Sequence, residues 1–436
     1  MAQAERTSPE PTPGEGGRNY SPIRERYLTE TAGSGTLHER AKQLLPGGTS
    51  RQAGFWMPYP LTYERAEGPF LYDVDGRQYF DLIYNYTAMV HGHGYPPIVE
   101  AAQRQAGIGT GWAGGNRLQL DLAEQMVDRI ASVEQVRFTN SGTEANALAF
   151  TIARKVTGRS KLLMARFGYH GSLMEFECGS FGHEGPITRL AAYNDLADFE
   201  RVLAEDDDIA MVILEPVLGS GGVVAADAAF LKGVGAAARK AGALFVIDEV
   251  MTLRFDYHGA QGALDITTDL TTFGKLIGGG FPVGAVGGQR DMLKIFDPDD
   301  LKLFHTGTFN ANPVTMAAGG VSLAELTSER IDDMARRAED LKTGLRAAAA
   351  TAGLPLAINH HASLLNLYFS DTPPESSVVR EDAELIGRFH LAAMNHGLFV
   401  APRGLIAMST VLTDAHIGEI SERAAAAMAD VAAETG

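Results

Sequence analysis

Short apolar runs alternate with helical stretches in the middle of the chain, and this alternation restricts the possible fold more than any other feature. The runs Gln135–Thr139, Ile209–Leu214 and Ala243–Ile247 are too short for typical helices and suit strands that are buried on both faces of a parallel sheet. The Ala-rich stretch from Ala228 to Ala241 predicts a helix between the last two runs. The pattern therefore predicts an α/β fold built on a mostly parallel, doubly wound sheet.

The two ends of the chain differ from this middle region. Pro, Gly, Ser, Thr and charged residues dominate as far as residue 36, which predicts a flexible leader or an arm lying on a partner. Beyond residue 325, long helical patterns surround a single strand and predict a smaller α+β domain. The expected divisions are a leader at 1–36, an N-terminal part of the small domain at 37–80, a large domain at 81–325 and a C-terminal part at 326–436.

Several elements of the small domain are predicted individually. The turn Asp75-Gly76 separates two short strands between Pro69 and Asp81. The remaining predictions are helices at 37–45, 328–352, 381–395 and from Asp414 onward, with one strand near 363–369.

Composition excludes several classes of protein. The chain has 37 basic and 54 acidic residues, a net charge of −17, which argues against binding to nucleic acid or anionic lipid. No apolar run is long enough for a membrane span, and the N-terminus lacks the pattern of a signal peptide. The single cysteine, Cys178, excludes an internal disulfide. These features predict a cytoplasmic protein without nucleic-acid or membrane partners.

Lys275 is the most unusual charged residue, because a Thr-rich approach precedes it and the glycines Gly278–Gly280 follow it. Glycines allow a bulky planar group to approach the backbone closely. A desolvated lysine shifts toward the neutral amine, the form that attacks a carbonyl carbon. The motif is typical of a lysine that carries pyridoxal phosphate, although the motif alone would favour an ordinary lysine at the edge of a loop.

Acidic residues follow two of the predicted strands at their carboxyl ends, where ligands bind in such sheets. Asp248 follows Ile247 and Glu215 follows Leu214. A carboxylate opposite a pyridine nitrogen would keep that nitrogen protonated and make the ring an electron sink. Either acid could instead cap a helix or pair with an arginine such as Arg254.

The turn after the first predicted strand has the features of an anion site. Ser141, three residues before Glu144, fits a capping box, and Gly142 and Thr143 add a permissive backbone and a hydroxyl. A plain capped helix would show the same pattern. Downstream, Tyr169 could stack on a planar ring and His170 has a supporting role, whereas Thr308 lies in a Gly/Thr turn that could add a phosphate hydroxyl.

The combined motifs strongly resemble the class III, fold-type I aminotransferases that use pyridoxal 5'-phosphate. The resemblance extends from about Leu37 to the C-terminus. It rests on five segments: Asn140–Ala145, Tyr169–Gly171, Glu215–Pro216, Asp248–Val250 and Thr272–Gly280.

The resemblance assigns roles to individual residues. Lys275 would hold the cofactor covalently and Asp248 would hold its pyridine nitrogen; both are the expected catalytic residues. The other expected cofactor-binding residues are Ser141, Gly142, Thr143, Tyr169, His170, Glu215 and Val250. Thr308 would reach the phosphate of a neighbouring subunit, so the resemblance implies a homodimer with shared active sites. It implies no metal.

Within the class, the chain looks most like the branch of β-amino-acid (β-phenylalanine) aminotransferases and glutamate-1-semialdehyde 2,1-aminomutase. The segments around Arg51 and Arg403 resemble those of the β-amino-acid aminotransferases. The expected substrate-binding residues are Arg51, Arg403 and Tyr84. Two guanidinium groups would allow one site to accept a β-amino acid and a dicarboxylate. Surface ion pairing is the alternative for both arginines.

These features predict ping-pong transfer of an amino group from a β-amino acid or related arylamine to a keto acid, either pyruvate or 2-oxoglutarate. An aminomutase is the main alternative, since it would need no external acceptor. Decarboxylation, racemisation or cofactor binding without catalysis is compatible with the same motifs.

Overall fold

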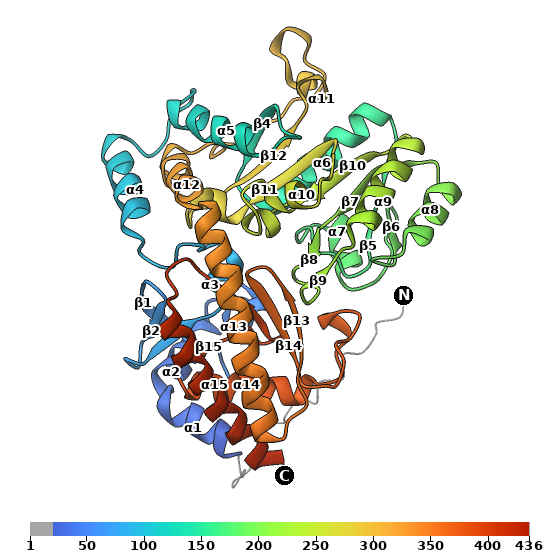
Figure 1. Ribbon diagram of the computed structural model, residues 1–436. Helices are drawn as coiled ribbons and strands as arrows, with labels where there is room; N and C mark the ends of the chain where they lie inside the picture. Colours follow the sequence, from blue (N-terminus) through green and yellow to red (C-terminus); the bar gives the residue numbers. More distant parts are fainter. Residues whose placement is uncertain (1–20, 436) are drawn as a thin grey trace.

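A twisted seven-stranded sheet forms the centre of one half of the molecule in the computed structural model, which describes residues 21–435 (Figure 1). Only β12 runs antiparallel to its neighbours, β4 and β11. This arrangement confirms the predicted α/β class. In spatial order the strands are β4 (Gln135–Thr139), β12 (Gly284–Gly288), β11 (Leu270–Gly274), β10 (Leu244–Asp248), β7 (Ile209–Leu214), β5 (Lys161–Ala165) and β6 (Thr188–Ala191).

Helices cover both faces of this sheet, which explains why its interior strand β7 is apolar along its whole length. All six residues of β7 are buried. Ile213 packs in the cluster that includes α6, whereas Val212 packs in the cluster that includes α8 and α9. The helices of this half are α4 (Pro96–Ile108), α5 (Arg117–Arg129), α6 (Gly142–Thr157), α7 (Met174–Ser180), α8 (Leu196–Glu205), α9 (Ala228–Lys240), α10 (Gly259–Ala263), α11 (Arg290–Leu293) and α12 (Pro313–Glu325).

Segments from both ends of the chain build the other half together. Strand β15 (Leu398–Phe399) pairs in parallel with β3 (Gln78–Asp81), which extends the hairpin of β1 (Tyr63–Glu67), β2 (Phe70–Asp73) and β3. A three-stranded sheet contains β13 (Ala357–His361), β14 (Leu364–Tyr368) and β16 (Leu405–Ala407). Helices α13 (Ser328–Ala352), α14 (Ala383–Asn395) and α15 (Asp414–Thr435) complete this half. The hairpin and these helices match the elements predicted for the small domain.

The prediction of a flexible leader through residue 36 is wrong for the part that the structure describes. Helices α1 (Pro22–Glu30) and α2 (Ala32–Ala41) occupy most of residues 22–41. Ser21 caps α1, and Ile23 and Tyr27 are buried. Few apolar residues suffice here because α1 packs on α14 and α15, which lie far away in the sequence. The predicted helix at 37–45 begins earlier and ends at Ala41, and residues 1–20 of the predicted leader lie outside the described residues.

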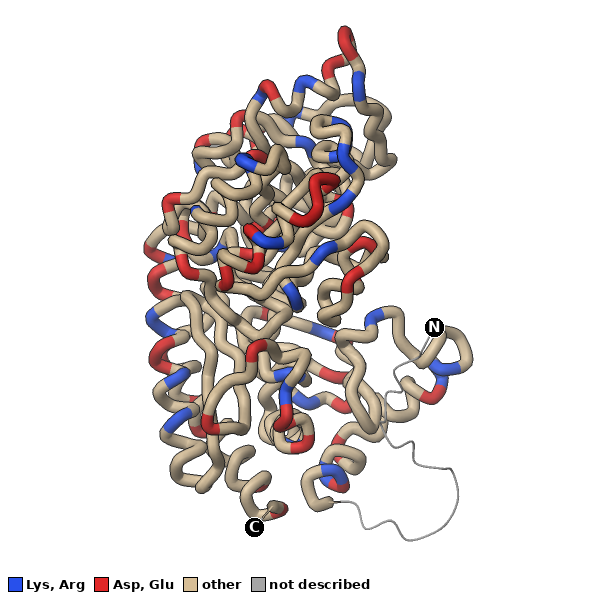
Figure 2. The backbone as a smooth tube through the Cα atoms, turned by 90° about the vertical axis from the view of Figure 1, so that its right-hand side faces the viewer, with Lys and Arg blue, Asp and Glu red and all other residues tan. Residues whose placement is uncertain are grey.

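The remaining elements are short. Strands β8 (Val217–Leu218) and β9 (Val224–Ala225) form a small ribbon, and α3 (Tyr84–Thr87) is a single turn. No helix in residues 21–435 is long and apolar enough to cross a membrane. Basic and acidic residues are interspersed along the chain (Figure 2).

Candidate active site

The ends of three adjacent strands bring the predicted catalytic residues to one edge of the sheet. Strand β10 lies between β7 and β11, with all three parallel. Asp248 is the last residue of β10, and Glu215 and Lys275 immediately follow β7 and β11. This edge is the carboxyl edge, where ligands bind in open α/β sheets.

Lys275 adopts a backbone conformation that is unusual for a residue with a side chain. Its φ is +49°, in the left-handed region, and it begins a short 3-10 turn that ends at Gly278. Left-handed backbone in a residue other than glycine costs about 1–3 kcal/mol and occurs most often at functional sites. Burial lowers the pKa of the Lys275 amine, while the carboxylates of Asp248 and Glu215 partly oppose that shift. The surroundings therefore favour the neutral, nucleophilic amine.

The Asp248 carboxylate is buried and held by three donors. Its Oδ2 accepts hydrogen bonds from Asn146 Nδ2 and pairs with His170 Nδ1, each at 2.8 Å, and its Oδ1 accepts from the Val250 amide at 2.9 Å. The other ring nitrogen of His170 is buried and has no partner within residues 21–435. His170 therefore orients the Asp248 carboxylate through its Nδ1 atom.

Glu215 lies beside this group and connects it to Tyr169. Its two oxygens accept from the amides of Tyr169 at 2.8 Å and Gly219 at 3.1 Å. Burial raises the pKa of Glu215 to about 7, and the charge of Asp248 adds to that shift. The Tyr169 ring itself is 43% exposed, so the tyrosine that was expected to stack on a cofactor has a face open to solvent.

The turn before α6 approaches the same strand ends. Ser141 caps the helix by accepting from the Glu144 amide at 3.1 Å, and the Glu144 carboxylate bonds the Asn140 amide. A side chain at Gly142 would lie 2.9 Å from Val250 Cγ2. The absence of a side chain thus allows the amides of this helix terminus to lie directly beside the β10 edge.

These residues fit pyridoxal phosphate. Buried Asp248 has three hydrogen-bond donors, but no lysine or arginine in the described part of the chain forms an ion pair with it. A buried carboxylate is costly unless it is also paired with a cation. The amino terminus of α6 suits a phosphate. Lys275 would hold the aldehyde carbon, Asp248 the ring nitrogen and the turn at Ser141–Thr143 the phosphate.

Arg51 and Arg403 come from distant segments and lie near one tyrosine. The Arg51 guanidinium is 5.6 Å from the centre of the Tyr86 ring, and both arginines oppose the upward pKa shift that burial gives Tyr86. Arg51 and Tyr86 line a cavity of about 540 Å³ together with Trp56, Tyr63 and Phe399. Arg403 Nη2 lies 3.1 Å from Ser220 Oγ, to which it donates.

Tyr84 lies elsewhere than its predicted substrate-binding role requires. Its side chain is fully buried in the core, and Tyr86, two residues later, faces the cavity instead. The cause is a left-handed turn, because Tyr84, Asn85, Tyr86 and Thr87 all have φ between +48° and +74°. Sequence periodicity carries no signal for such a turn.

Thr308 is exposed on the loop before α12. In the same loop, Asn310 accepts a hydrogen bond from Asn140 beside the Ser141 turn. The role of Thr308 toward a neighbouring subunit stays a prediction. Asn146 is a residue that sequence analysis missed, although a polar side chain among the apolar positions of α6 was an available signal.

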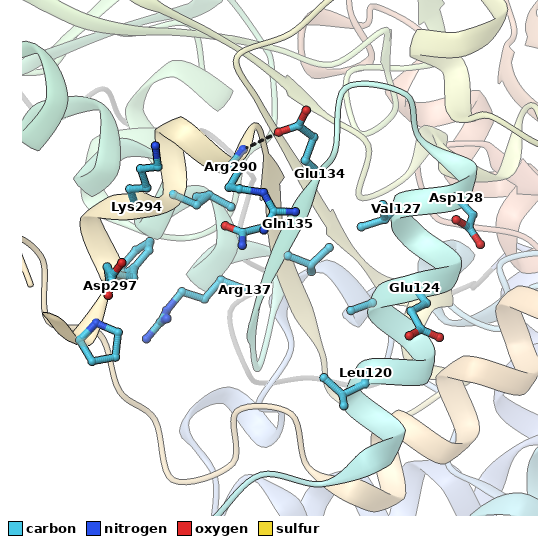
Figure 3. A pocket seen from close by; sticks show the side chains of 15 residues that line it. Leu120, Glu124, Val127, Asp128, Glu134, Gln135, Arg137, Arg290, Lys294 and Asp297 are labelled. Carbon is cyan, nitrogen blue, oxygen red and sulfur yellow. Dashed lines mark hydrogen bonds between the residues drawn. The ribbon is translucent and has the colours of Figure 1, made fainter. Parts of the chain in front are cut away.

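A second cavity, of about 800 Å³, contains none of the predicted site residues. It lies between α5, β4 and the segment 290–298 (Figure 3). Its wall includes the Arg290 amide, which donates to Glu134 at 2.9 Å. Among the described residues, no group of acidic, histidine or cysteine side chains is arranged to bind a metal.

Comparison with known proteins places this geometry in a family. The model for "Aminotransferase class-III" matches residues 55–428. The β-phenylalanine transaminase of Variovorax paradoxus is 38% identical over 400 residues, which cover 90% of this chain and 92% of that one. Glutamate-1-semialdehyde 2,1-aminomutase 2 of Bacillus pumilus is 36% identical over 405 residues, covering 87% and 94%.

Solved structures agree. An omega-transaminase from Sphaerobacter thermophilus has a TM-score of 0.87 and 35% identity, covering 91% of this chain and 97% of its own. A transaminase with pyridoxal phosphate bound has a TM-score of 0.88 and 32% identity, covering 93% and 99%. The chain is therefore a class III aminotransferase, an enzyme of the family that uses pyridoxal phosphate.

Proposed function

We propose that this enzyme transfers the amino group of a β-amino acid or a related arylamine to pyruvate or 2-oxoglutarate by a ping-pong mechanism. The observation that supports this choice is the pair of arginines near Tyr86, beside a cavity with aromatic walls. A guanidinium binds a carboxylate through two parallel hydrogen bonds, and aromatic walls suit an aryl substituent. The similarity to a β-phenylalanine transaminase points in the same direction.

Different residues of the chain transfer the proton, hold the cofactor and bind the substrate carboxylates. Pyridoxal phosphate supplies a ring that stabilises negative charge beside the donor nitrogen. The Lys275 amine, with its pKa lowered by burial, takes the proton from the amine-bearing carbon and later returns one. Asp248 would hold the ring nitrogen and keep the ring electron-withdrawing, and His170 and Asn146 keep the Asp248 carboxylate in place. Arg51 and Arg403 would hold the carboxylates of donor and acceptor.

We also propose a homodimer in the cytoplasm, with Thr308 completing the phosphate site of the partner. The domain boundaries expected at residues 80 and 325 are part of the same proposal. Exposed apolar side chains at Trp112, Phe304 and Phe309 support the homodimer, because single-chain proteins rarely expose such groups together.

The test is a half-reaction followed by absorbance. Holoenzyme mixed with 3-amino-3-phenylpropanoate, without acceptor, should change the visible absorbance of its bound cofactor, and pyruvate or 2-oxoglutarate should restore it. Arg51→Gln and Arg403→Gln should each raise the KM for the carboxylate substrate that they bind about tenfold or more. Lys275→Ala is the control: its visible absorbance should not change when the β-amino acid is added. An unchanged wild-type spectrum would exclude the β-amino-acid donor.

The aminomutase alternative rests on the relatives of that activity. It predicts conversion of glutamate-1-semialdehyde without any external acceptor. Product formation from that substrate alone, together with no response to the β-amino acid, would favour it over the proposed transamination.

A further inference from the structure

The segment that carries Arg51 has little regular structure of its own. Residues 49–62, here called the arginine segment, contain one short 3-10 turn at Gln52–Gly54 and precede β1. Arg51 forms no ion pair with any residue in 21–435 and is exposed. The position of its guanidinium therefore depends on whatever holds the arginine segment.

Helices α1 and α2 hold it through side chains that are buried. The Tyr27 hydroxyl donates to the Tyr59 carbonyl at 2.8 Å and accepts from Trp56 Nε1 at 3.0 Å. Tyr27 is 0% exposed and Trp56 is 7% exposed. One hydroxyl thus joins two points of the arginine segment, three residues apart.

Further contacts continue along α2. The Tyr59 hydroxyl donates to the Thr31 carbonyl at 3.1 Å, and Ser34 Oγ accepts from the Thr62 amide at 3.1 Å. The Tyr59 ring also lies so close to Gly35 that a Cβ there would be 2.8 Å from it. The His38 ring faces Phe55 at 5.8 Å between ring centres.

The two helices are themselves fixed to the C-terminal part of the chain. The Ile23 amide donates to Glu434 at 2.7 Å, and Asn395 Nδ2 donates to the Ile23 carbonyl at 2.8 Å. Arg26 donates to the Asn395 carbonyl at 2.8 Å. The arginine segment is also held at the cavity. There, two residues after Arg51, the Ala53 carbonyl accepts a hydrogen bond from the Tyr86 hydroxyl.

We propose that helices α1 and α2 set carboxylate affinity by positioning the arginine segment, with Tyr27 as the positioning residue that acts through Trp56 and Tyr59 on Arg51. The proposal deepens the proposed function and rests on its assignment of Arg51 to carboxylate binding. It gives these helices a role in substrate recognition, although they lie outside the matched family region, which begins at residue 55.

The test compares two variants that disturb the contact differently. Tyr27→Phe removes both hydrogen bonds and keeps the ring. Gly35→Ala removes no hydrogen-bonding group, and alanine favours a helix, but its methyl group would lie 2.8 Å from the Tyr59 ring and displace it. Gly418→Ala is the matched control, because it places the same methyl group in open space on α15.

Both variants should raise the KM for 3-amino-3-phenylpropanoate about tenfold, with kcat changed by less than about twofold. The KM for 1-phenylethylamine, which has no carboxylate, should stay within about twofold of the wild type, and Gly418→Ala should behave as wild type. Equal KM increases for both donors would overturn the proposal, since they would indicate general damage to the site.

Two further measurements test the positioning role of Tyr27 without measuring catalysis. In a Trp112→Phe background, Tyr27→Phe should shift the emission of Trp56 to longer wavelength and increase its quenching by acrylamide. Binding of inert 3-phenylpropanoate to the holoenzyme should weaken about tenfold in Tyr27→Phe and in Gly35→Ala, but not in Gly418→Ala. If binding is equal in all variants, the proposal fails, whether or not the enzyme transaminates a β-amino acid.

Discussion

At the scale of single residues, the strand edge gathers ionisable groups that burial drives toward neutral forms. Burial lowers the pKa of the Lys275 amine and raises that of the Glu215 carboxyl to about 7. These shifts weaken the charges of Lys275 and Glu215 beside the cofactor site, where the Asp248 carboxylate would hold a cationic ring nitrogen. Glu215 then acts chiefly through its hydrogen bonds to the Tyr169 and Gly219 amides.

Glu215 should make stability depend on pH in a defined window. Its folded-state pKa of about 7 lies above the usual 4.5, so the folded protein binds the extra proton between these values and loses stability as pH rises through them. The loss is on the order of 3 kcal/mol. Denaturant unfolding of the cofactor-free protein between pH 4.5 and 8 should show a smaller decline for Glu215→Gln than for wild type. Parallel curves for the two proteins would contradict the assignment.

At the scale of elements, the site depends on close approaches between turns and strand ends. Gly142 at the start of α6 lies against Val250 after β10, and the Cβ position of Gly274 is 3.4 Å from the Gly142 backbone. The phosphate turn, the Asp248 strand and the Lys275 strand therefore share one junction, so a change at one of them displaces the others.

Gly142→Ala should weaken cofactor binding more than it weakens the fold. The added methyl group would lie 2.9 Å from Val250, which forces the amides of α6 away from the strand edge. We expect a loss of pyridoxal phosphate affinity of about tenfold or more, and a decrease of about 1–3 kcal/mol in the free energy of unfolding. Cofactor titration followed by absorbance measures the first. Gly107→Ala, on α4 with open space around the position, should change neither, and a similar cofactor affinity in both variants would refute the expectation.

At the scale of the whole molecule, sequence patterns predicted the features that depend on residues close together in the chain. The strand-end positions of Asp248 and Glu215 followed from apolar runs of strand length, whereas Lys275 followed from its own motif without a predicted strand before it; the structure brings all three together. Sequence patterns did not predict which side chains are buried where contacts with distant segments or an unusual backbone turn decide their positions. Tyr27 is buried because Trp56, Tyr79 and Met394, all distant in the sequence, pack around it. Tyr86 replaces Tyr84 at the cavity because of a left-handed turn.

Association of two copies is the property that this larger scale should control. Two loops with exposed apolar residues are joined, since Asn312 Nδ2 donates to the Thr110 carbonyl and Asn116 Nδ2 to the Ala311 carbonyl. Together they expose Trp112, Phe304 and Phe309, which are 48%, 75% and 65% exposed.

Phe304→Glu combined with Phe309→Glu should convert the proposed dimer to monomers, because two charges would have to be desolvated in the interface. Sedimentation velocity measures the change, and cofactor affinity should fall with it if Thr308 completes the phosphate site of the partner. Val379→Glu is the control: that side chain, in the short turn Ser377–Val379 between β14 and α14, is 47% exposed. Its substitution should leave the dimer intact. A wild-type monomer that retains full cofactor affinity would show that each active site is complete within one chain.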